Sequence, residues 1–272
     1  MNSTNKEFTQ IFEELIYASN LLIKNTVASD VLVFIGQSPN YLSYIVEKER
    51  FVIRVPCSGR FLIDEYTIPN ELQLSGIKKL FDELGLSEEI ISNKYVNIIF
   101  IDHSHSGQSI SSFGKLLNIL YDVNKRYDFI NIVSPTQVKD LWILIPDFSV
   151  INTTNFLVMP ILVAIANNEY PRSIPIYQYW KWTEEPNFTE TKEGLIFVSN
   201  LMNYYNNIFL KKDFLTINND IKMICPKFGK NILFNEKILN QQNTQQIFGL
   251  KNNQIKGFNL FINSIPIDAY IH

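Results

Sequence analysis

The sequence predicts an α/β fold: a parallel-sheet core with helices on both faces, followed by a C-terminal extension or subdomain. Over residues 1–150, short continuous apolar runs alternate with amphipathic stretches at helical spacing. Such apolar runs are typical of strands buried on both faces of a parallel sheet. The chain has 272 residues, 46% of them hydrophobic, which is enough for a sizeable core and excludes a disordered chain.

The first predicted unit is strand, tight turn and helix, preceded by an amphipathic helix over Lys6–Lys24. Val31–Ile35 (VLVFI) predicts a buried strand that stops at Gly36. Helical spacing resumes in SPNYLSYIVEKE, where Ser38 is the expected N-cap and Pro39 the first helical residue.

A strand, a loop and a second strand are predicted next, over residues 51–63, because two β-rich runs flank Pro56–Gly59. Residues 70–85 predict a helix that ends at Gly85.

The clearest strand–turn–helix unit follows. Val96–Ile101 predicts a buried strand, residues 102–109 (DHSHSGQS) a polar turn, and residues 110–126 a helix. Further predicted elements are strands at 129–134 and 141–146, a buried helix in the apolar run 156–166, and a helix near 193–211.

The alternating pattern ends after Pro171, so we expect an α/β domain over residues 1–170 and an extension over residues 171–272. The formal net charge of -3 gives no reason to expect a nucleic-acid partner. Cys57 and Cys225 are too few for a disulfide scaffold and fit a reducing, cytoplasmic location. The N-terminus resembles no signal peptide, and no apolar run is long enough to cross a bilayer, so no membrane partner is expected.

The polar turn at residues 102–109 has the composition of an anion site. In open α/β sheets ligands bind where the carboxyl ends of strands meet helix N-termini. Free backbone N–H groups at a helix start, beside the hydroxyls of Ser106 and Ser109, attract phosphate, and Gly107 lets the backbone approach it closely. The alternative is a capped junction without a ligand, because Asp102 and Ser106 are also common capping residue types.

The turn resembles the phosphoribosyl-pyrophosphate (PRPP) motif of the type I phosphoribosyltransferases, which has four apolar residues, two acids and a turn ending in Thr/Ser-Gly-x-Thr/Ser. Aligned on Ser106–Ser109, Asp102 falls on the second acid and Ile101 on the first, so one acid is missing. The resemblance implies that Asp102 holds the ribose hydroxyls or the Mg²⁺ that accompanies PRPP, and that His105 lies near the reacting base. The implied 5′-phosphate cradle is His105, Ser106, Gly107, Gln108 and Ser109.

An upstream turn fits the same family, which has an earlier strand followed by a pyrophosphate-binding turn. VLVFIGQSPNYL supplies such a turn, and residues 51–63 would supply the family's flexible loop. Taken alone, the Gly-Gln-Ser sequence is better explained by a plain turn than by a pyrophosphate site. The resemblance covers about residues 10–165, and it assigns the pyrophosphate to Gly36, Gln37 and Ser38, with Arg54 or Arg60.

By this resemblance the chain would bind PRPP or a related phosphosugar or nucleotide. An active enzyme would transfer ribose 5-phosphate to a nitrogenous base, mainly by positioning and by stabilising an oxocarbenium-like sugar. The alternative is a non-catalytic binding or assembly protein that keeps the fold, with Ile101 and Tyr41 filling the cavity. The aromatic run Tyr177–Trp182 would then serve homo-oligomer or partner contacts.

Other chemistries fit the sequence less well. A hydrolase nucleophile elbow would need both glycines of G-x-S-x-G, and the only histidine after this turn is His272. A metal site at Asp102, His103 and His105 would need further ligands from distant acids. No base for a nucleophilic Cys57 can be identified, so a plain loop cysteine is expected.

Overall fold

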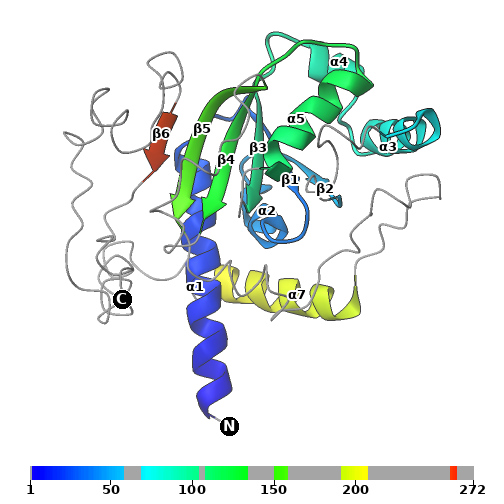
Figure 1. The fold of residues 1–272 in the computed structure, drawn as a ribbon. Helices are drawn as coiled ribbons and strands as arrows, with labels where there is room; N and C mark the ends of the chain where they lie inside the picture. Colours follow the sequence, from blue (N-terminus) through cyan, green and yellow to red (C-terminus); the bar gives the residue numbers. More distant parts are fainter. Residues whose placement is uncertain are drawn as a thin grey trace.

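The computed structural model describes residues 2–57, 69–103, 108–133, 150–158, 191–207 and 258–261. These residues form a parallel sheet with helices on both faces (Figure 1), which confirms the predicted α/β class. Within the described residues the sheet has six strands in the order β2-β1-β3-β4-β5-β6, and every neighbouring pair is parallel. The strands are β1 Val31–Ile35, β2 Phe51–Val55, β3 Ile98–His103, β4 Tyr127–Val133, β5 Ile151–Val158 and β6 Phe258–Phe261.

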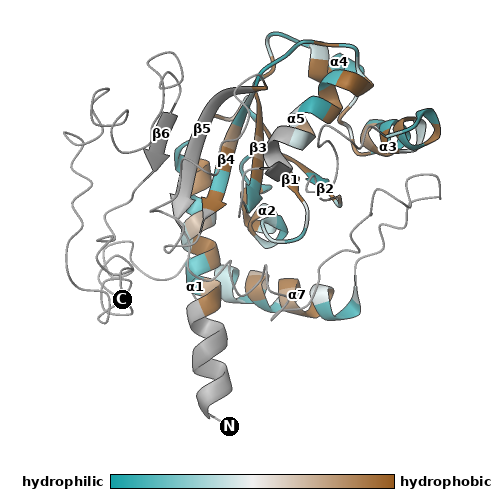
Figure 2. Cartoon of the chain, viewed as in Figure 1, coloured by the Kyte–Doolittle hydropathy of each residue, from teal (hydrophilic) through white to brown (hydrophobic). Residues whose placement is uncertain are grey.

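Helices follow β1, β2 and β3, and the described helices cover both faces of the sheet (Figure 1). They are α1 Asn2–Lys24, α2 Asn40–Val46, α3 Glu71–Glu83, α4 Glu88–Ser92, α5 Gln108–Leu120 and α7 Lys192–Asn207. None of the described helices is long and apolar enough to cross a membrane. In Figure 2, α3 and α7 carry both hydrophobic and hydrophilic residues, as helices with one buried side do.

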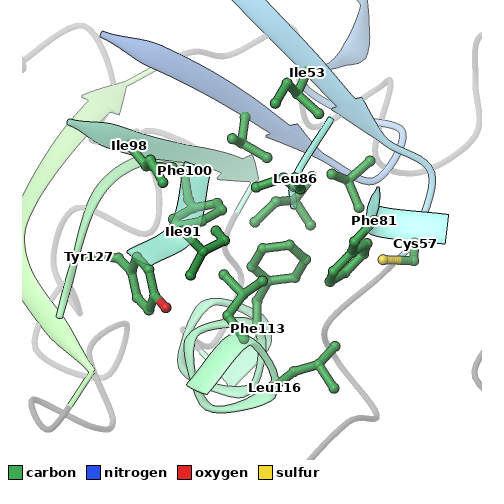
Figure 3. Packing of buried hydrophobic residues seen from close by; sticks show 14 of the residues in the cluster. Ile53, Cys57, Phe81, Leu86, Ile91, Ile98, Phe100, Phe113, Leu116 and Tyr127 are labelled. Atoms are coloured by element: carbon green, nitrogen blue, oxygen red, sulfur yellow. The ribbon is translucent and has the colours of Figure 1, made fainter. Parts of the chain in front are cut away.

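Two hydrophobic cores lie on opposite faces of the sheet. The α5-side core packs α3, α4 and α5 against the sheet and is shown in Figure 3. At its centre, the ring centroid of Phe100 lies 5.1 Å from that of Phe113 and 5.4 Å from that of Phe129. The α1-side core packs α1, α2 and α7 against the other face, where the Tyr41 and Phe197 centroids are 4.6 Å apart.

Alternation along each strand determines which core a residue joins. On β3, Phe100 belongs to the α5-side core and Ile101 to the α1-side core. On β1, Val33 and Phe34 divide in the same way. Both faces of these strands are therefore covered, as their continuous apolar runs predict.

Most of the predicted elements in the first half of the chain are confirmed with small shifts. The helix after β1 begins at Asn40, with Pro39 as its N-cap and without a side-chain cap, so the prediction of Ser38 as the N-cap is wrong. The turn after β3 also begins later than predicted, because Asp102 and His103 still belong to the strand. α5 ends at Leu120, since the chain turns at Asp122 with a φ of 47°.

One predicted helix is wrong in its first residues. The apolar run that begins at Phe156 starts within strand β5, where Phe156 pairs with Asn131 of β4. A long apolar run does not by itself distinguish a buried helix from a buried strand. The predicted strands at 60–63 and 141–146 lie outside the described residues.

Two segments of the predicted C-terminal extension take part in this fold. Phe197 and Leu201 of α7 are buried in the α1-side core, and one end of α7 meets α1 (Figure 1). Strand β6 extends the sheet by pairing with β5, with Phe156 beside Leu260. The aromatic run 177–182 lies outside the described residues.

Candidate functional site

The chain leaves two adjacent strands toward opposite faces of the sheet. β1 and β3 are neighbours, with Phe34 beside Ile101. After β1 the chain enters α2, on the α1-side core, and after β3 it enters α5, on the α5-side core. Such a divergence is a topological switch point, and the crevice at the carboxyl ends of these strands is where open α/β sheets bind ligands.

Gly36 forms the turn at the end of β1. Its φ is 73°, a left-handed conformation that side chains other than glycine rarely adopt. Its N–H donates to the carbonyl of Val55 over 2.8 Å, and the N–H of Asn40 donates to the carbonyl of Gln37 over 3.1 Å. The glycine is therefore required by the direction of the chain as it passes from β1 to α2.

Asp102 is the corresponding residue near the end of β3. It is 7% exposed, and it lies on the α5 side of the sheet because its neighbour Ile101 faces the α1-side core. Ile101 itself is fully buried there. The position of the missing first acid is thus part of a hydrophobic core, where an unpaired carboxylate would be strongly destabilising.

Asn131 lies directly beside Asp102, since the two are register partners on β4 and β3. It is 1% exposed and shares the α5 side of the sheet, as its neighbours Ile130 and Ile132 face the other core. Asn131 was not among the site residues predicted from the sequence. The available signal was a single carboxamide inside the apolar strand run FINIV.

Cys57 completes this part of the edge, immediately after β2. Burial raises the pKa of its thiol, and the negative charge of Asp102 raises it further, which places the carboxylate within electrostatic range of the thiol. A Cβ atom at Gly36 would lie 3.7 Å from the Cys57 carbonyl oxygen. A fully buried, protonated thiol is a poor nucleophile, as expected for a structural cysteine.

Gln37 contributes a hydrogen-bond donor to the same turn. Its Nε2 atom is buried and has no hydrogen-bond partner within the part of the chain that the structure describes. A buried donor left without an acceptor costs roughly 1–3 kcal/mol. A hydrogen-bond acceptor placed near the turn after β1 would therefore be stabilised by this donor.

The structure places Arg54 away from Asp102. On β2, Ile53 and Val55 face the α5-side core, so Arg54 lies on the α1 side of the sheet. Its Nε donates to Ser43 Oγ over 2.6 Å, its guanidinium pairs with Glu47, and its Cζ lies 4.2 Å from the centroid of the Tyr44 ring. Ser38 is half-buried in the turn before α2.

The remaining predicted site residues can be placed only in part. Gln108 and Ser109 open α5, so the turn does lead into a helix N-terminus. His105, Ser106, Gly107 and Arg60 lie outside the described residues. Tyr41, the other predicted cavity-filling residue, is fully buried in the α1-side core.

The donor groups at this edge bear on metal binding. Among the described residues, no group of three or more His, Cys, Asp and Glu side chains could hold a metal ion. Asp102 brings one carboxylate, and its neighbours bring a carboxamide and a buried thiol. Mg²⁺ is usually held by one or two carboxylates together with waters and substrate phosphates, and Asp102 could supply one such carboxylate.

Comparisons with protein-family models, with curated proteins and with solved structures found no match to this chain.

Proposed function

We propose that this protein binds a small phosphorylated ligand, a phosphosugar or a nucleotide, at the carboxyl edge of the sheet between β1 and β3. One observation carries the proposal. The Gly36 turn follows β1 and Asp102 lies near the end of the adjacent β3, and the helices that follow these two strands lie on opposite faces of the sheet. Open α/β sheets bind their ligands outside the carboxyl ends of the strands at such a switch point.

The chemistry of this edge suits such a ligand. The sequence SGQS leads into α5, whose first backbone N–H groups lack intrahelical acceptors and favour an anion. Asp102 adds an acceptor for hydroxyl groups, and Gln37 Nε2 adds a donor. A phosphosugar would match both groups, with its phosphate at the start of α5 and its hydroxyls beside Asp102.

The resemblance to the PRPP motif makes the proposed ligand more specific. The ligand would then be PRPP, and an active enzyme would transfer its ribose 5-phosphate to a nitrogenous base. A non-catalytic binding or assembly role is favoured by one observation. Ile101, at the position of the first acid, is buried in the α1-side core and cannot contact a ligand at the strand ends.

The test is calorimetric titration of the full chain with ribose 5-phosphate, PRPP and inorganic phosphate, each in the presence of Mg²⁺. We expect saturable binding that is lost in Asp102→Ala and Ser106→Ala. The matched control is Asp30→Ala, because Asp30 is a comparably buried carboxylate, 5% exposed, placed just before β1 at the opposite edge of the sheet.

Three results are informative. Binding that survives in Asp30→Ala and is lost in Asp102→Ala supports a site at the carboxyl edge. The absence of heat at millimolar ligand, with a folded protein, excludes the proposed ligands. Turnover of PRPP in the presence of a base would distinguish an enzyme from a binding protein.

A further inference from the structure

Helix α2 carries the chain away from the Gly36 turn of the candidate site. It begins at Asn40 and has only seven residues, and its N-cap Pro39 makes no side-chain hydrogen bond to the first turn. Isolated helices shorter than about 12 residues are marginal in water, so contacts with neighbouring elements must hold α2 in place. The position of the turn after β1 therefore depends on those contacts.

Strand β2 and helix α1 hold the middle of α2. The Nε of Arg54 on β2 donates to Ser43 Oγ over 2.6 Å. On α1, the hydroxyl of Ser19 donates to the carbonyl of Leu42 over 3.3 Å. Both contacted residues lie between the two ends of the helix.

Helix α7 contacts α2 near both of its ends (Figure 1). Near the start of α2, the ring centroid of Phe197 lies 4.6 Å from that of Tyr41, which is fully buried. Just beyond the end of α2, Lys48 Nζ donates to Asn206 Oδ1 over 2.8 Å and lies 4.5 Å from the centroid of the Tyr205 ring. The side chains of α7 thus hold α2 on either side of the contacts made by β2 and α1.

Helix α7 is in turn fixed to α1. Phe197 packs edge-to-face on Phe12, with 5.4 Å between the ring centroids. The Tyr204 hydroxyl donates to Glu13 Oε1 over 2.5 Å. Because α1 packs against the sheet through the α1-side core, α7 ties the helix that follows the turn to a fixed part of the fold.

We infer that α7 is a positioning helix for the candidate site: by holding α2 near both ends, it keeps the turn at Gly36 and Gln37 in the position that binds ligand. This inference rests on the proposed function, since it concerns the same site. Linkage makes the effect reciprocal, so a ligand bound at the turn should also favour the docked position of α7. One helix of the predicted C-terminal extension thereby gains a role.

Hydrogen exchange in the full chain tests this link without a ligand. Leu201→Ala removes a fully buried side chain of α7 from the α1-side core, and the matched control Leu116→Ala makes the same change on α5 in the opposite core. We expect the amides of residues 36–46 to exchange about tenfold or more faster in Leu201→Ala, and within about twofold of the wild type in Leu116→Ala. Equal acceleration in the two variants would overturn the inference, because it would reflect overall stability alone.

A milder variant covers the case in which Leu201→Ala fails to fold. Tyr204→Phe removes only the hydroxyl that donates to Glu13, and neither residue belongs to α2. Any change in α2 must therefore pass through α7. We expect the amides of residues 36–46 to exchange about threefold or more faster than in the wild type. Unchanged exchange there would overturn the inference.

A ligand experiment connects α7 to the site. With saturating ribose 5-phosphate, the amides of residues 192–207 in the wild type should exchange about threefold or more slowly. Ligand binding that leaves this exchange unchanged would overturn the inference and leave the proposed function intact. No binding by the wild type would refute the proposed function, and the exchange of residues 36–46 would still decide whether α7 controls the turn.

Discussion

The backbone N–H of Gly36 donates to the carbonyl of Val55 over 2.8 Å, which ties the turn after β1 to the end of the neighbouring strand β2. Gly36 holds this position with a φ of 73°. The turn then delivers Gln37 and the start of α2 to the carboxyl edge of the sheet. The geometry of the candidate site thus depends on one left-handed residue.

We expect Gly36→Ala to destabilise the protein by about 1–2 kcal/mol, because a left-handed backbone is costly for a residue with a Cβ atom. Crowding should add little, since the new Cβ would lie 3.7 Å from the Cys57 carbonyl oxygen, an ordinary contact. Equilibrium unfolding in urea measures the change. Gly36→Asn is the matched control and should cost less, because asparagine tolerates the left-handed region. Equal losses for the two variants would point to crowding instead of backbone strain.

The Cys57 thiol predicts a loss of stability at alkaline pH. Its pKa is raised above the ordinary value of 9.0 by burial and by Asp102, so the folded state holds this proton more tightly than the unfolded chain. The stabilising contribution is complete below about pH 9 and declines as the pH rises above that value, by up to about 1.4 kcal/mol per pH unit.

Urea unfolding of the wild type and Cys57→Ala between pH 8 and about pH 9.5 tests this linkage. The wild type should lose stability more steeply than Cys57→Ala over that interval, whatever their difference at pH 8. The interval stops below pH 10 because burial also raises the pKa of Tyr41 and Tyr127 above the usual 10.0, and these residues add their own alkaline dependence. Parallel curves for the two proteins would mean that Cys57 ionises equally in both states.

Strands β1 and β3 were predictable because they are buried on both faces. A strand such as Val31–Ile35 must be apolar at every position, which makes it visible as a continuous run that ends at a turn residue. The same reasoning failed at Phe156, where the apolar run continues past the strand and no periodicity separates strand from helix. Helix α4 was not predicted, since its five residues are too few to show a period.

Individual residues of the candidate site could be predicted from the sequence, but their positions relative to one another could not. Gly36 and Asp102 follow or end apolar strands, so their place at the carboxyl edge could be inferred from the sequence alone. That β1 and β3 are neighbours, and that Asn131 lies beside Asp102, depends on strand order and register. Both result from long-range pairing between strands, for which one sequence carries no local signal.

Arg50 should be important for the stability of the amino edge of the sheet. Its Nη2 donates to the carbonyls of Ile23 and Thr26 over 2.5 and 2.9 Å, and its Nε donates to Thr26 Oγ1 over 3.1 Å. Ile23 lies in the last turn of α1, whose carbonyls lack intrahelical partners. We expect Arg50→Ala to cost about 2 kcal/mol in urea unfolding, because hydrogen bonds from a charged donor are worth roughly 1.5–3 kcal/mol.

Arg50→Lys separates charge from geometry. Lysine keeps the positive charge near the end of α1 but cannot reproduce the planar fork that reaches several acceptors. We expect it to recover less than half of the stability lost in Arg50→Ala. Full recovery would mean that the attraction between the cation and the helix C-terminus, and not the set of directed hydrogen bonds, supplies the stabilisation.

Replacing Gly114, which lies within α5, with alanine should not give the gain in stability that usually follows the replacement of a helical glycine. Gly→Ala in a helix normally stabilises by about 1 kcal/mol. Here the new Cβ would lie 3.0 Å from both Cβ and Cγ2 of Val150, and 3.6 Å from Cδ2 of Tyr127. Gly114→Ala should therefore be neutral or destabilising.

The double variant with Val150→Ala should be more stable than the sum of the two single changes predicts, by roughly 0.5–3 kcal/mol in a urea double-mutant cycle. If the changes in the free energy of unfolding are additive, Val150 moves aside without cost. A small residue at position 114 is then not required where α5 meets the start of β5.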